Sequence, residues 1–369
     1  MPRVLYISKP VAPPWNDSSK NLVRDLVTHL VRYEPRVLGR RDENGFRPPR
    51  GAVEPVYPPA GGGFAPGLRD NARVLRRLLS GPPADLWHFF FAPNPRSARA
   101  GRMAARFRRV PTVQTVCSAP RLDLSAAEVL FADRTVVLSR HTEARLLREG
   151  ARPESLRRIP PALEPLAPPD ASTRRRARTD LGLPAEVPLV VYPGDLEFGG
   201  GAERVLEAMA VPALRGAHLA MACRAKTDAA QRAETVIRER ARELGIGDRV
   251  WWLGETAHIH ALLGTADVVA LPSVDLFAKM DYPLVLLEAM SLERPVVVAR
   301  ATPAEELAEG GAAVAVAPEP ELVAHTLAQL LDDDTERHRI GRAARESVTR
   351  RFDPTKVAAA YEELYDELL

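Results

Sequence analysis

Glu288 stands out because a carboxylate lies inside an apolar run. The run Leu284-Val-Leu-Leu-Glu-Ala-Met290 predicts a helix, and it follows a strand-like segment at 268–271 and a polar loop. A charged side chain in such a helix is costly unless a polar group reaches it. We therefore expect a hydroxyl-rich ligand to meet Glu288 close to the N-terminus of this helix.

A glycine-rich segment supplies a second kind of chemistry. Gly194 and the triplet Gly199, Gly200 and Gly201 lie between a strand predicted at 189–192 and a helix predicted at 202–210. Glycines leave backbone N–H groups unobstructed at a helix N-terminus, where the helix dipole also favours phosphate. A turn that needs only positive φ is the alternative interpretation. The position after the first strand of an α/β domain favours phosphate binding.

The elements that position these residues follow an α/β pattern in both halves of the chain. Short apolar strands alternate with amphipathic helices, which predicts two doubly wound, Rossmann-like domains with parallel sheets. We expect an N-terminal domain at 1–165, a proline- and arginine-rich linker at 166–187, a C-terminal domain at 188–350, and a helix at 351–369 that packs back on the first domain. Ligands of such folds bind at the carboxyl ends of the strands, so we expect the two domains to face a cleft.

Composition restricts the remaining possibilities. Hydrophobic residues make up 46% and charged residues 27% of the chain, as in soluble globular proteins. No apolar run could span a bilayer, and the first residues predict a strand rather than a signal peptide, so we expect a cytoplasmic protein. Cys117 and Cys223 do not form a disulfide framework, and His258 and His260 lack neighbouring acidic or sulfur ligands, so no metal site is predicted.

The order of the motifs resembles the family 4 glycosyltransferases, which have the two-domain GT-B fold. The segments that carry the resemblance follow the glycine-rich turn: Val250-Trp-Trp-Leu-Gly254, Ala266-Asp-Val-Val-Ala-Leu-Pro-Ser273, Leu284-Val-Leu-Leu-Glu-Ala-Met290 and Arg294-Pro-Val-Val-Val298. Ala132-Asp-Arg-Thr-Val-Val-Leu-Ser139 and Ile159-Pro160 fit the end of that family's first domain. The resemblance implies transfer of a sugar from a nucleotide-sugar donor, with retention of anomeric configuration and without a metal or other cofactor. A UDP-sugar is the donor we expect first, and the base and the sugar stay open.

The same resemblance assigns roles in the donor site. Glu288 matches the glutamate that binds the ribose hydroxyls, and the glycine turn would receive the diphosphate together with the backbone N–H groups of Leu284 and Val285. The family's other paired glutamate, which contacts the donor sugar, falls on Met280 in this chain. Lys279 or Asp281 would then act near the sugar. Pro283 replaces a family glycine and removes one backbone donor.

The glycine turn also departs from the family pattern in its charges. The family places an Arg and a Lys there, and the corresponding residues in this chain are Asp195 and Gly200. Because a hydrogen bond to a charged group contributes about 1.5–3 kcal/mol, losing both cations would weaken diphosphate binding unless others replace them. Lys279, Arg224 and Lys226 are the candidates, and solvated surface charge is the alternative for each.

The first domain supplies candidates as well. Asp17, Ser18 and Lys20 open the first long helix where the family has a glycine-rich loop, so we expect them to contact donor phosphate or the acceptor, with helix capping as the alternative. His88 resembles a strand-end histidine of the family and is a candidate catalytic residue, although a hydrogen-bonded core histidine fits equally well. Cys117 falls where the family often has a functional histidine, and we expect a buried, inert thiol.

Charge is divided unequally along the chain. Residues up to Pro165 hold 28 Lys and Arg against 15 Asp and Glu, and the rest hold 23 against 33. In the basic half, Arg99, Arg102 and Arg106 share a helical face, followed by Arg108 and Arg109. Arginines at this spacing usually form a solvated helix face. The family resemblance leaves a second possibility open, a peripheral contact with the acidic inner face of a membrane. No motif indicates nucleic-acid binding.

The resemblance and the residues together predict a glycosyltransferase with a nucleotide-sugar donor and an unidentified acceptor. Two alternatives remain open. A catalytically silent GT-B partner or regulatory protein would explain the departures at Met280, Asp195, Gly200 and Cys117. The second alternative is a GT-B enzyme of the sugar-nucleotide epimerase type.

Overall fold

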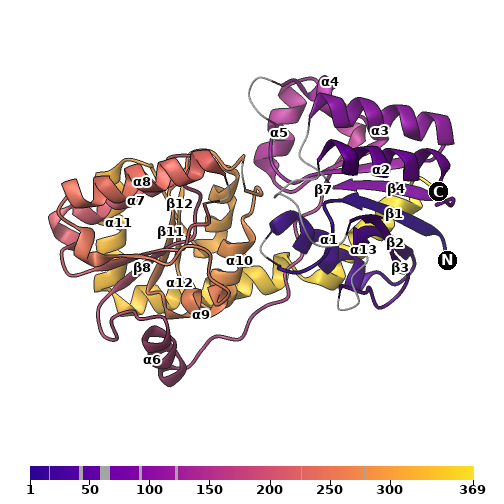
Figure 1. Cartoon of the computed structure of the whole chain (residues 1–369). Helices are drawn as coiled ribbons and strands as arrows, with labels where there is room; N and C mark the ends of the chain where they lie inside the picture. The colour runs from indigo at the N-terminus through magenta and orange to yellow at the C-terminus, as the bar shows by residue number, and fades with distance from the viewer. Residues whose placement is uncertain are drawn as a thin grey trace. The chain divides into compact units, whose positions relative to one another are not determined.

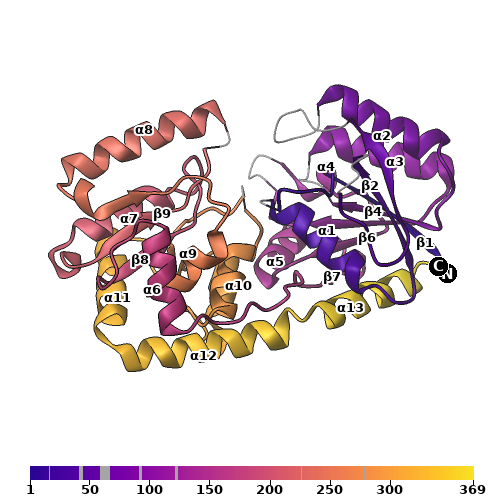
Figure 2. The same ribbon diagram turned by 60° about the horizontal axis from the view of Figure 1, so that its bottom comes forward.

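The chain folds into two compact units, each built around a parallel sheet (Figures 1 and 2). The computed structural model describes residues 1–15, 17–40, 45–58, 67–90, 94–120, 124–225, 227–277 and 279–369. The first unit comprises Met1–Glu164, Lys279–Asp281 and Phe352–Leu369, and the second comprises Pro165–Ala278 and Tyr282–Arg351. Parallel sheets covered by helices confirm the predicted class of doubly wound α/β domains.

The sheet of the first unit has the strand order β3-β2-β1-β4-β5-β6-β7. Its strands are β1 (Arg3–Ser8), β2 (Glu34–Arg40), β3 (Ala52–Tyr57), β4 (Leu86–Phe90), β5 (Thr112–Val116), β6 (Arg134–Val137) and β7 (Leu156–Arg158). Its α-helices are α1 (Ser18–His29), α2 (Leu68–Ser80), α3 (Pro95–Arg108), α4 (Ala126–Val129), α5 (Arg140–Arg148) and α13 (Pro354–Asp366). β4 is buried throughout and β1 is buried after Arg3, and most of their residues are apolar, as expected for central strands that are covered on both faces.

Successive residues of β1 and β4 point to opposite faces of this sheet. Leu5 and Trp87 are register partners, and they pack in a core with Leu78 of α2 and Ala104 of α3. The next pair along, Tyr6 and His88, points to the other face. That face is covered by α13, which also packs against α1 (Figure 2).

The sheet of the second unit has the order β10-β9-β8-β11-β12-β13. Its strands are β8 (Leu189–Tyr192), β9 (His218–Met221), β10 (Val250–Trp252), β11 (Val268–Leu271), β12 (Val296–Ala299) and β13 (Val314–Val316). Its α-helices are α6 (Ala171–Asp180), α7 (Gly201–Ala210), α8 (Asp228–Glu243), α9 (Ile259–Thr265), α10 (Leu284–Ser291), α11 (Pro320–Asp332) and α12 (Asp334–Arg351). Helices α7, α8 and α11 pack together, as do α6, α9, α10 and α12, so the sheet lies between two helical layers (Figure 1).

Both sheets have a topological switch point, where the chain reverses the direction in which strands are added. In the first unit this point lies between β1 and β4, and in the second between β8 and β11. Loops that leave the carboxyl ends of strands at such a point diverge and leave room for a ligand. The glycine turn follows β8 and the segment that leads to α10 follows β11, so both predicted donor-binding segments lie at the switch point of the second unit.

Two features of the fold differ from the sequence prediction. Residues 166–187, expected to form a linker, belong to the second unit and contain α6, whose residue Arg178 is buried. Strands β2, β3, β7 and β13 and helix α11 were not predicted. β3 carries Glu54 and Pro55 and lies at the edge of its sheet, so its composition does not resemble a covered strand. Among the described residues, no helix is both long and apolar enough to cross a membrane.

Candidate functional site

The glycine turn after β8 is held by close packing against the loop after β11. Gly199 and Gly200 have φ values of 75° and 57°, in the left-handed region that favours glycine. A Cβ at Gly201, the first residue of α7, would lie 2.1 Å from Ser273 Oγ and 2.8 Å from the Tyr192 hydroxyl. The Val274 N–H donates to the Gly199 carbonyl at 3.1 Å. The turn therefore needs glycine for both backbone conformation and space.

Asp195 organises this turn from within. Its carboxylate accepts hydrogen bonds from the N–H groups of Glu197 (2.8 Å) and Phe198 (3.1 Å), and its carbonyl accepts one from the Tyr192 hydroxyl (2.9 Å). An aspartate that closes a turn through its own backbone is a common local arrangement. Asp195, which occupies a position where the family has a cation, thus has a structural role in this turn.

Arg204 is a cation at the turn that the sequence argument missed. Its Nη1 group donates to the carbonyl oxygens of Gly199 (3.1 Å) and Gly200 (2.7 Å). The side chain is half-buried and lies in the first turn of α7. Its spacing of four residues from Gly200 in a predicted helix could have suggested the contact. A guanidinium fixed at a helix N-terminus adds positive potential where the helix dipole is already positive.

The N-terminus of α10 presents unused backbone donors to the same end of the sheet. The first hydrogen bonds of its ladder are donated by Leu286 and Leu287 to the Pro283 carbonyl, at 2.9 and 3.3 Å. The N–H groups of Leu284 and Val285 precede this ladder and are among the donors that a helix cannot satisfy itself. Among the described residues, the N-cap Pro283 gives them no side-chain hydrogen bond.

Glu288 has a partner within the chain. Its Oε1 lies 3.4 Å from Nε2 of His260, the second residue of α9. The Glu288 side chain is 16% exposed and that of His260 is 52% exposed, so the pair lies at the protein surface. The carboxylate therefore does not depend on a ligand for a polar contact, contrary to the argument from the sequence, but it stays within reach of one.

Two further loops at this end of the sheet contribute charges. Arg224, after β9, forms an ion pair with Glu255, after β10, at 3.1 Å. Thr227 donates from its hydroxyl to Glu197 at 2.7 Å, which ties the loop after β9 to the glycine turn. Lys226, the other cation predicted in this loop, lies outside the described residues.

Lys279, Met280 and Asp281 group with the first unit rather than with Glu288. Asp281 is fully buried: it accepts a hydrogen bond from the Ser139 hydroxyl (2.6 Å), and its N–H donates to the Cys117 carbonyl (2.9 Å). Met280 is also buried. This environment is that of a structural carboxylate, so it argues against the catalytic role predicted for Asp281. Lys279 is half-buried, and its predicted role stays a prediction.

His88 is fully buried beneath α13. Its Nδ1 lies 2.7 Å from the Tyr365 hydroxyl and its Nε2 lies 2.8 Å from Thr115 Oγ1. The chain of contacts continues to Tyr6 and Tyr361, whose hydroxyls meet those of Tyr365 and Thr115 at 3.0 and 3.2 Å. Burial holds the pKa of His88 well below its usual value. Both ring nitrogens are used inside the core, so the structure favours the core role over the predicted catalytic role.

The residues predicted for the first domain are engaged with one another. Asp17 is the N-cap of α1; it accepts from the Ser19 N–H (3.0 Å) and forms an ion pair with Lys9 (2.9 Å). Burial would raise the pKa of Asp17, but Lys9 and the hydrogen bonds from Ser19 outweigh it and lower the pKa. Ser18 is half-buried at the first position of α1.

Lys20 and Cys117 complete this part of the first unit. Lys20 donates from Nζ to the carbonyls of Ala12 (3.0 Å) and Pro14 (2.9 Å), which pins the loop after β1. The pKa of Cys117 is raised to about 12, first by burial and then by the charges of Asp281 and Asp17. A thiol with such a pKa is inert at neutral pH. Within the described part of the chain, no group of three or more His, Cys, Asp or Glu residues is arranged to hold a metal ion.

Residues 173–347 match the family described as Glycosyl transferases group 1. The matched segment includes the glycine turn, α10 and Glu288, and covers most of the second unit. The match therefore falls on the part of the chain that contains the predicted donor-binding segments.

Curated relatives align with part of the chain. D-inositol 3-phosphate glycosyltransferase of Corynebacterium efficiens is 31% identical over 207 residues, which cover 52% of this chain and 46% of that protein. The enzyme of the same name from Corynebacterium diphtheriae is 31% identical over 289 residues, 73% of this chain and 62% of that protein. The chain thus spans about half to about two thirds of the length of these relatives.

The structural comparison extends over both units. The crystal structure of Anabaena HepE in complex with UDP and glucose has a TM-score of 0.78 and 19% sequence identity, and covers 100% of both chains. Together with the domain match, this confirms the GT-B fold and the predicted resemblance to the glycosyltransferases of that fold.

Proposed function

We propose that this chain is a glycosyltransferase that takes a sugar from a UDP-sugar. The observation that carries the proposal is the arrangement at the switch point of the second unit: a glycine turn, the free N-terminus of α10 and Glu288 lie together in the segment that matches the group 1 family. A structure of the same fold binds UDP and glucose, and the relatives are named as glycosyltransferases, which supports a nucleotide-sugar donor.

Each part of this arrangement suits one part of the donor. Glu288 can accept two hydroxyl donors of a ribose, and His260 is exposed enough to turn aside. The N–H groups of Leu284 and Val285 suit a diphosphate, since helix N-termini bind phosphate through free donors and the dipole. Arg204 takes the place of the cations that the glycine turn lacks, because it is fixed next to the same turn.

Catalysis in this proposal rests on positioning and on stabilisation of the departing diphosphate. The charge that develops on the diphosphate is met by the backbone donors of α10 and the guanidinium of Arg204. We propose that transfer retains the anomeric configuration and needs no metal. The acceptor is held by groups other than His88, which is enclosed in the core of the first unit.

A screen of nucleotides and nucleotide sugars by thermal shift tests the proposal, followed by transfer and hydrolysis assays of the stabilising compounds with and without EDTA. We expect UDP and a UDP-sugar to raise the melting temperature more than other nucleotides, EDTA to have no effect, and the product anomer to match the donor by NMR. Stabilisation by no nucleotide contradicts the proposal.

A catalytically silent GT-B protein is the second candidate, and the placement of Asp281 favours it. Met280 stands where the family has a sugar-contacting glutamate, and Asp281, the neighbouring carboxylate, is fully buried against Ser139. Such a protein would bind UDP and show neither transfer nor donor hydrolysis. The same screen therefore separates the two candidates.

We further propose that helices α2 and α3 contact an acidic membrane surface. The two helices pack side by side and carry nine arginines against one acidic residue, Asp70. Leu68 is 87% exposed, and Met103 and Phe107 are exposed among these arginines. Apolar side chains among cations suit an anionic bilayer surface. Sedimentation with vesicles that contain anionic lipid, compared with neutral vesicles, tests this contact, and Phe107→Glu should reduce it.

A further inference from the structure

A pocket of about 380 Å³ lies at the opposite end of the second sheet from Glu288. Its lining includes α6, the segment that precedes β8, Asp267, and the corner between α11 and α12. Asp267 directly precedes β11, and its Oδ2 accepts the N–H of Leu189, the first residue of β8, at 2.8 Å. The pocket is therefore at the amino ends of the two central strands, away from the loops assigned to the donor.

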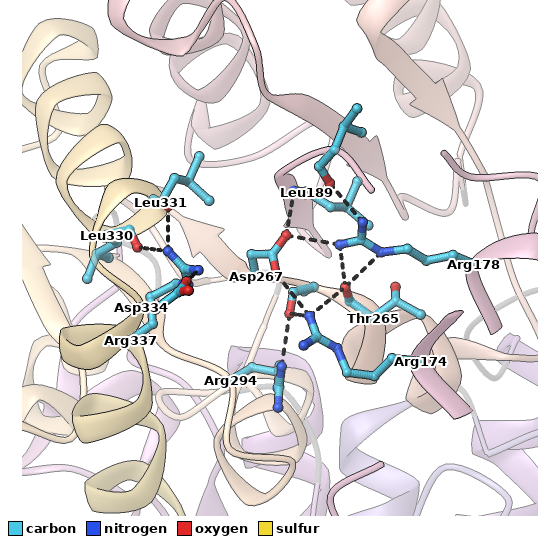
Figure 3. A network of polar contacts seen from close by, with 12 residues as sticks. Arg174, Arg178, Leu189, Thr265, Asp267, Arg294, Leu330, Leu331, Asp334 and Arg337 are labelled. Carbon is cyan, nitrogen blue, oxygen red and sulfur yellow. Dashed lines mark hydrogen bonds and ion pairs between the residues drawn. The ribbon is translucent and has the colours of Figure 1, made fainter. Parts of the chain in front are cut away.

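Asp267 is the only carboxylate at the inner wall described by the structure, and two arginines bind it. Arg178 Nη2 and Arg174 Nη2 each lie 2.9 Å from one of its oxygens (Figure 3). Arg178 is buried, and its remaining donors reach the carbonyls of Thr265, Pro184, Ala185 and Val187. Arg178 alone balances the charge of Asp267, so the charge of Arg174 is in excess.

A third guanidinium increases this excess. Arg294 donates from Nη1 to the Ala266 carbonyl, which Arg174 Nη2 also approaches (Figure 3). The pKa of Arg294 is lowered to about 10, first by burial and then by the charge of Arg174. Three guanidiniums thus face two carboxylates, Asp267 and, beside Arg294, Glu293. Partly buried charges are normally paired, so the group lacks negative charge.

The hydrogen bonds around Arg174 also indicate that the group of arginines lacks a negatively charged partner. Arg174 Nε is buried, and none of the described residues accepts its hydrogen bond. Arg175, the next residue on α6, also lines the pocket and is exposed. On the far wall, Arg337 donates to the carbonyls of Leu330 (2.6 Å) and Leu331, and to Asp334. Asp334 is 79% exposed and Glu186 is exposed, so these acids lie on the rim and leave the inner excess uncompensated.

We propose that this pocket binds a phosphate group, as inorganic phosphate or as a phosphate monoester, with Arg174 and Arg175 as its ligands. A phosphate carries close to two negative charges and several acceptor oxygens, and the planar fork of arginine matches its geometry. It supplies the missing negative charge. A volume of about 380 Å³ leaves room for a small organic body beyond the phosphate.

Calorimetric titration of the full chain with inorganic phosphate and with a sugar phosphate at constant ionic strength tests the proposal. We expect wild type to bind at least one of them with Kd of about 1 mM or tighter, and Arg174→Gln and Arg175→Gln each to weaken binding about tenfold or more. Arg176→Gln is the matched control, because Arg176 is exposed on the same helix and outside the pocket lining. Binding of the sugar phosphate alone identifies a monoester site.

The diphosphate site at α10 could also take phosphate, so the titration is repeated with UDP present. Phosphate bound at the arginine pocket should persist, and the two arginine variants should keep the UDP affinity of wild type. The proposal is overturned if wild type binds neither anion at about 10 mM, a concentration well above the expected Kd, or if Arg175→Gln binds as wild type does. Arg175 is exposed, so its variant should fold even if Arg174→Gln proves unstable.

Discussion

The two units share a doubly wound topology, but their switch points are built differently. After β1, the loop of the first unit is closed by side chains: Lys20 binds its carbonyls, and Asp17 caps α1 and pairs with Lys9. After β8, the loop of the second unit is closed by glycine packing and by Asp195, and the nearby N-terminus of α10 has no side-chain cap.

The difference gives a physical reason why the diphosphate site proposed above lies in the second unit and not in the first. A capping aspartate takes up backbone donors at a helix N-terminus and adds a negative charge there. Pro283, the N-cap residue of α10, has no polar side-chain group and therefore takes up no backbone donor. Donors that remain available are the basis of anion binding at helix ends, so the second unit is the one suited to a diphosphate.

The largest effect is expected from filling the space at the glycine turn. Gly201→Val places a Cβ 2.1 Å from Ser273 Oγ, so the turn must move away from the loop after β11. We expect UDP affinity to fall about 100-fold, equivalent to about 2.7 kcal/mol. Gly216→Val is the control, since a Cβ there meets nothing within 4 Å. Equal UDP affinity of the two variants, by calorimetry, would remove the glycine turn from the donor site.

In the first unit, breaking the buried polar chain should reduce stability without changing UDP affinity. Tyr365→Phe removes the partner of both His88 Nδ1 and the Tyr6 hydroxyl. Leaving buried polar groups unsatisfied costs about 1–3 kcal/mol, which denaturant unfolding measures. Tyr33→Phe should cost less, because its partner Asp366 is half exposed and can turn to water. A change in UDP affinity for Tyr365→Phe would contradict the separate roles of the units.

The lowered pKa of His88 predicts a pH dependence of stability. Because His88 stays neutral when folded, the unfolded chain binds an extra proton at pH values below about 6.5 and above the folded pKa. The free energy of unfolding should therefore fall with decreasing pH in this window, by up to about 1.4 kcal/mol per pH unit from this residue. Above about pH 6.5, His88 is neutral in both the folded and the unfolded chain, so it adds no further pH dependence to the free energy of unfolding. His88→Gln should have a shallower pH profile, and an unchanged profile would show that His88 is protonated in the fold.

A smaller effect is expected at the cap of α1. Asp17→Ala removes the side chain that accepts from the Ser19 N–H, and loss of an N-cap costs about 1 kcal/mol. Asp170→Ala, which removes the equivalent cap of α6, should cost a similar amount in the second unit. We expect neither variant to change UDP affinity. A weaker affinity in Asp17→Ala alone would mean that the loop of the first unit contacts the donor.

The central strands of the second unit, the glycine turn and α10 could be located from sequence, because covered strands are continuous apolar runs; the donor-binding roles of the turn and α10 stay predictions. The runs at 189–192 and 268–271 are strands as expected, with the glycine turn and α10 at their carboxyl ends. β13, in which only Val316 is buried, was missed, and α6 was taken as linker because of its low hydropathy. Local patterns identify elements whose burial is complete.

The contacts that decide the roles of single residues could not be predicted in the same way. The pairing of His260 with Glu288 joins two helices, and the burial of Asp281 depends on Ser139 of a distant segment. Arg204 was missed because its charge is used on carbonyls of the preceding turn. The first two contacts depend on three-dimensional packing, which no spacing in the sequence encodes, whereas the Arg204 contact is local.

Calorimetric titration of UDP into wild type and Glu288→Ala tests the central claim most directly. Removal of the carboxylate should raise the Kd for UDP at least tenfold, a difference of about 1.4 kcal/mol, because the ribose hydroxyls lose a charged acceptor. His260→Ala removes the partner of Glu288 and should leave UDP affinity unchanged or improved. Equal UDP affinity of wild type and Glu288→Ala would contradict the assignment of the donor to this end of the second sheet.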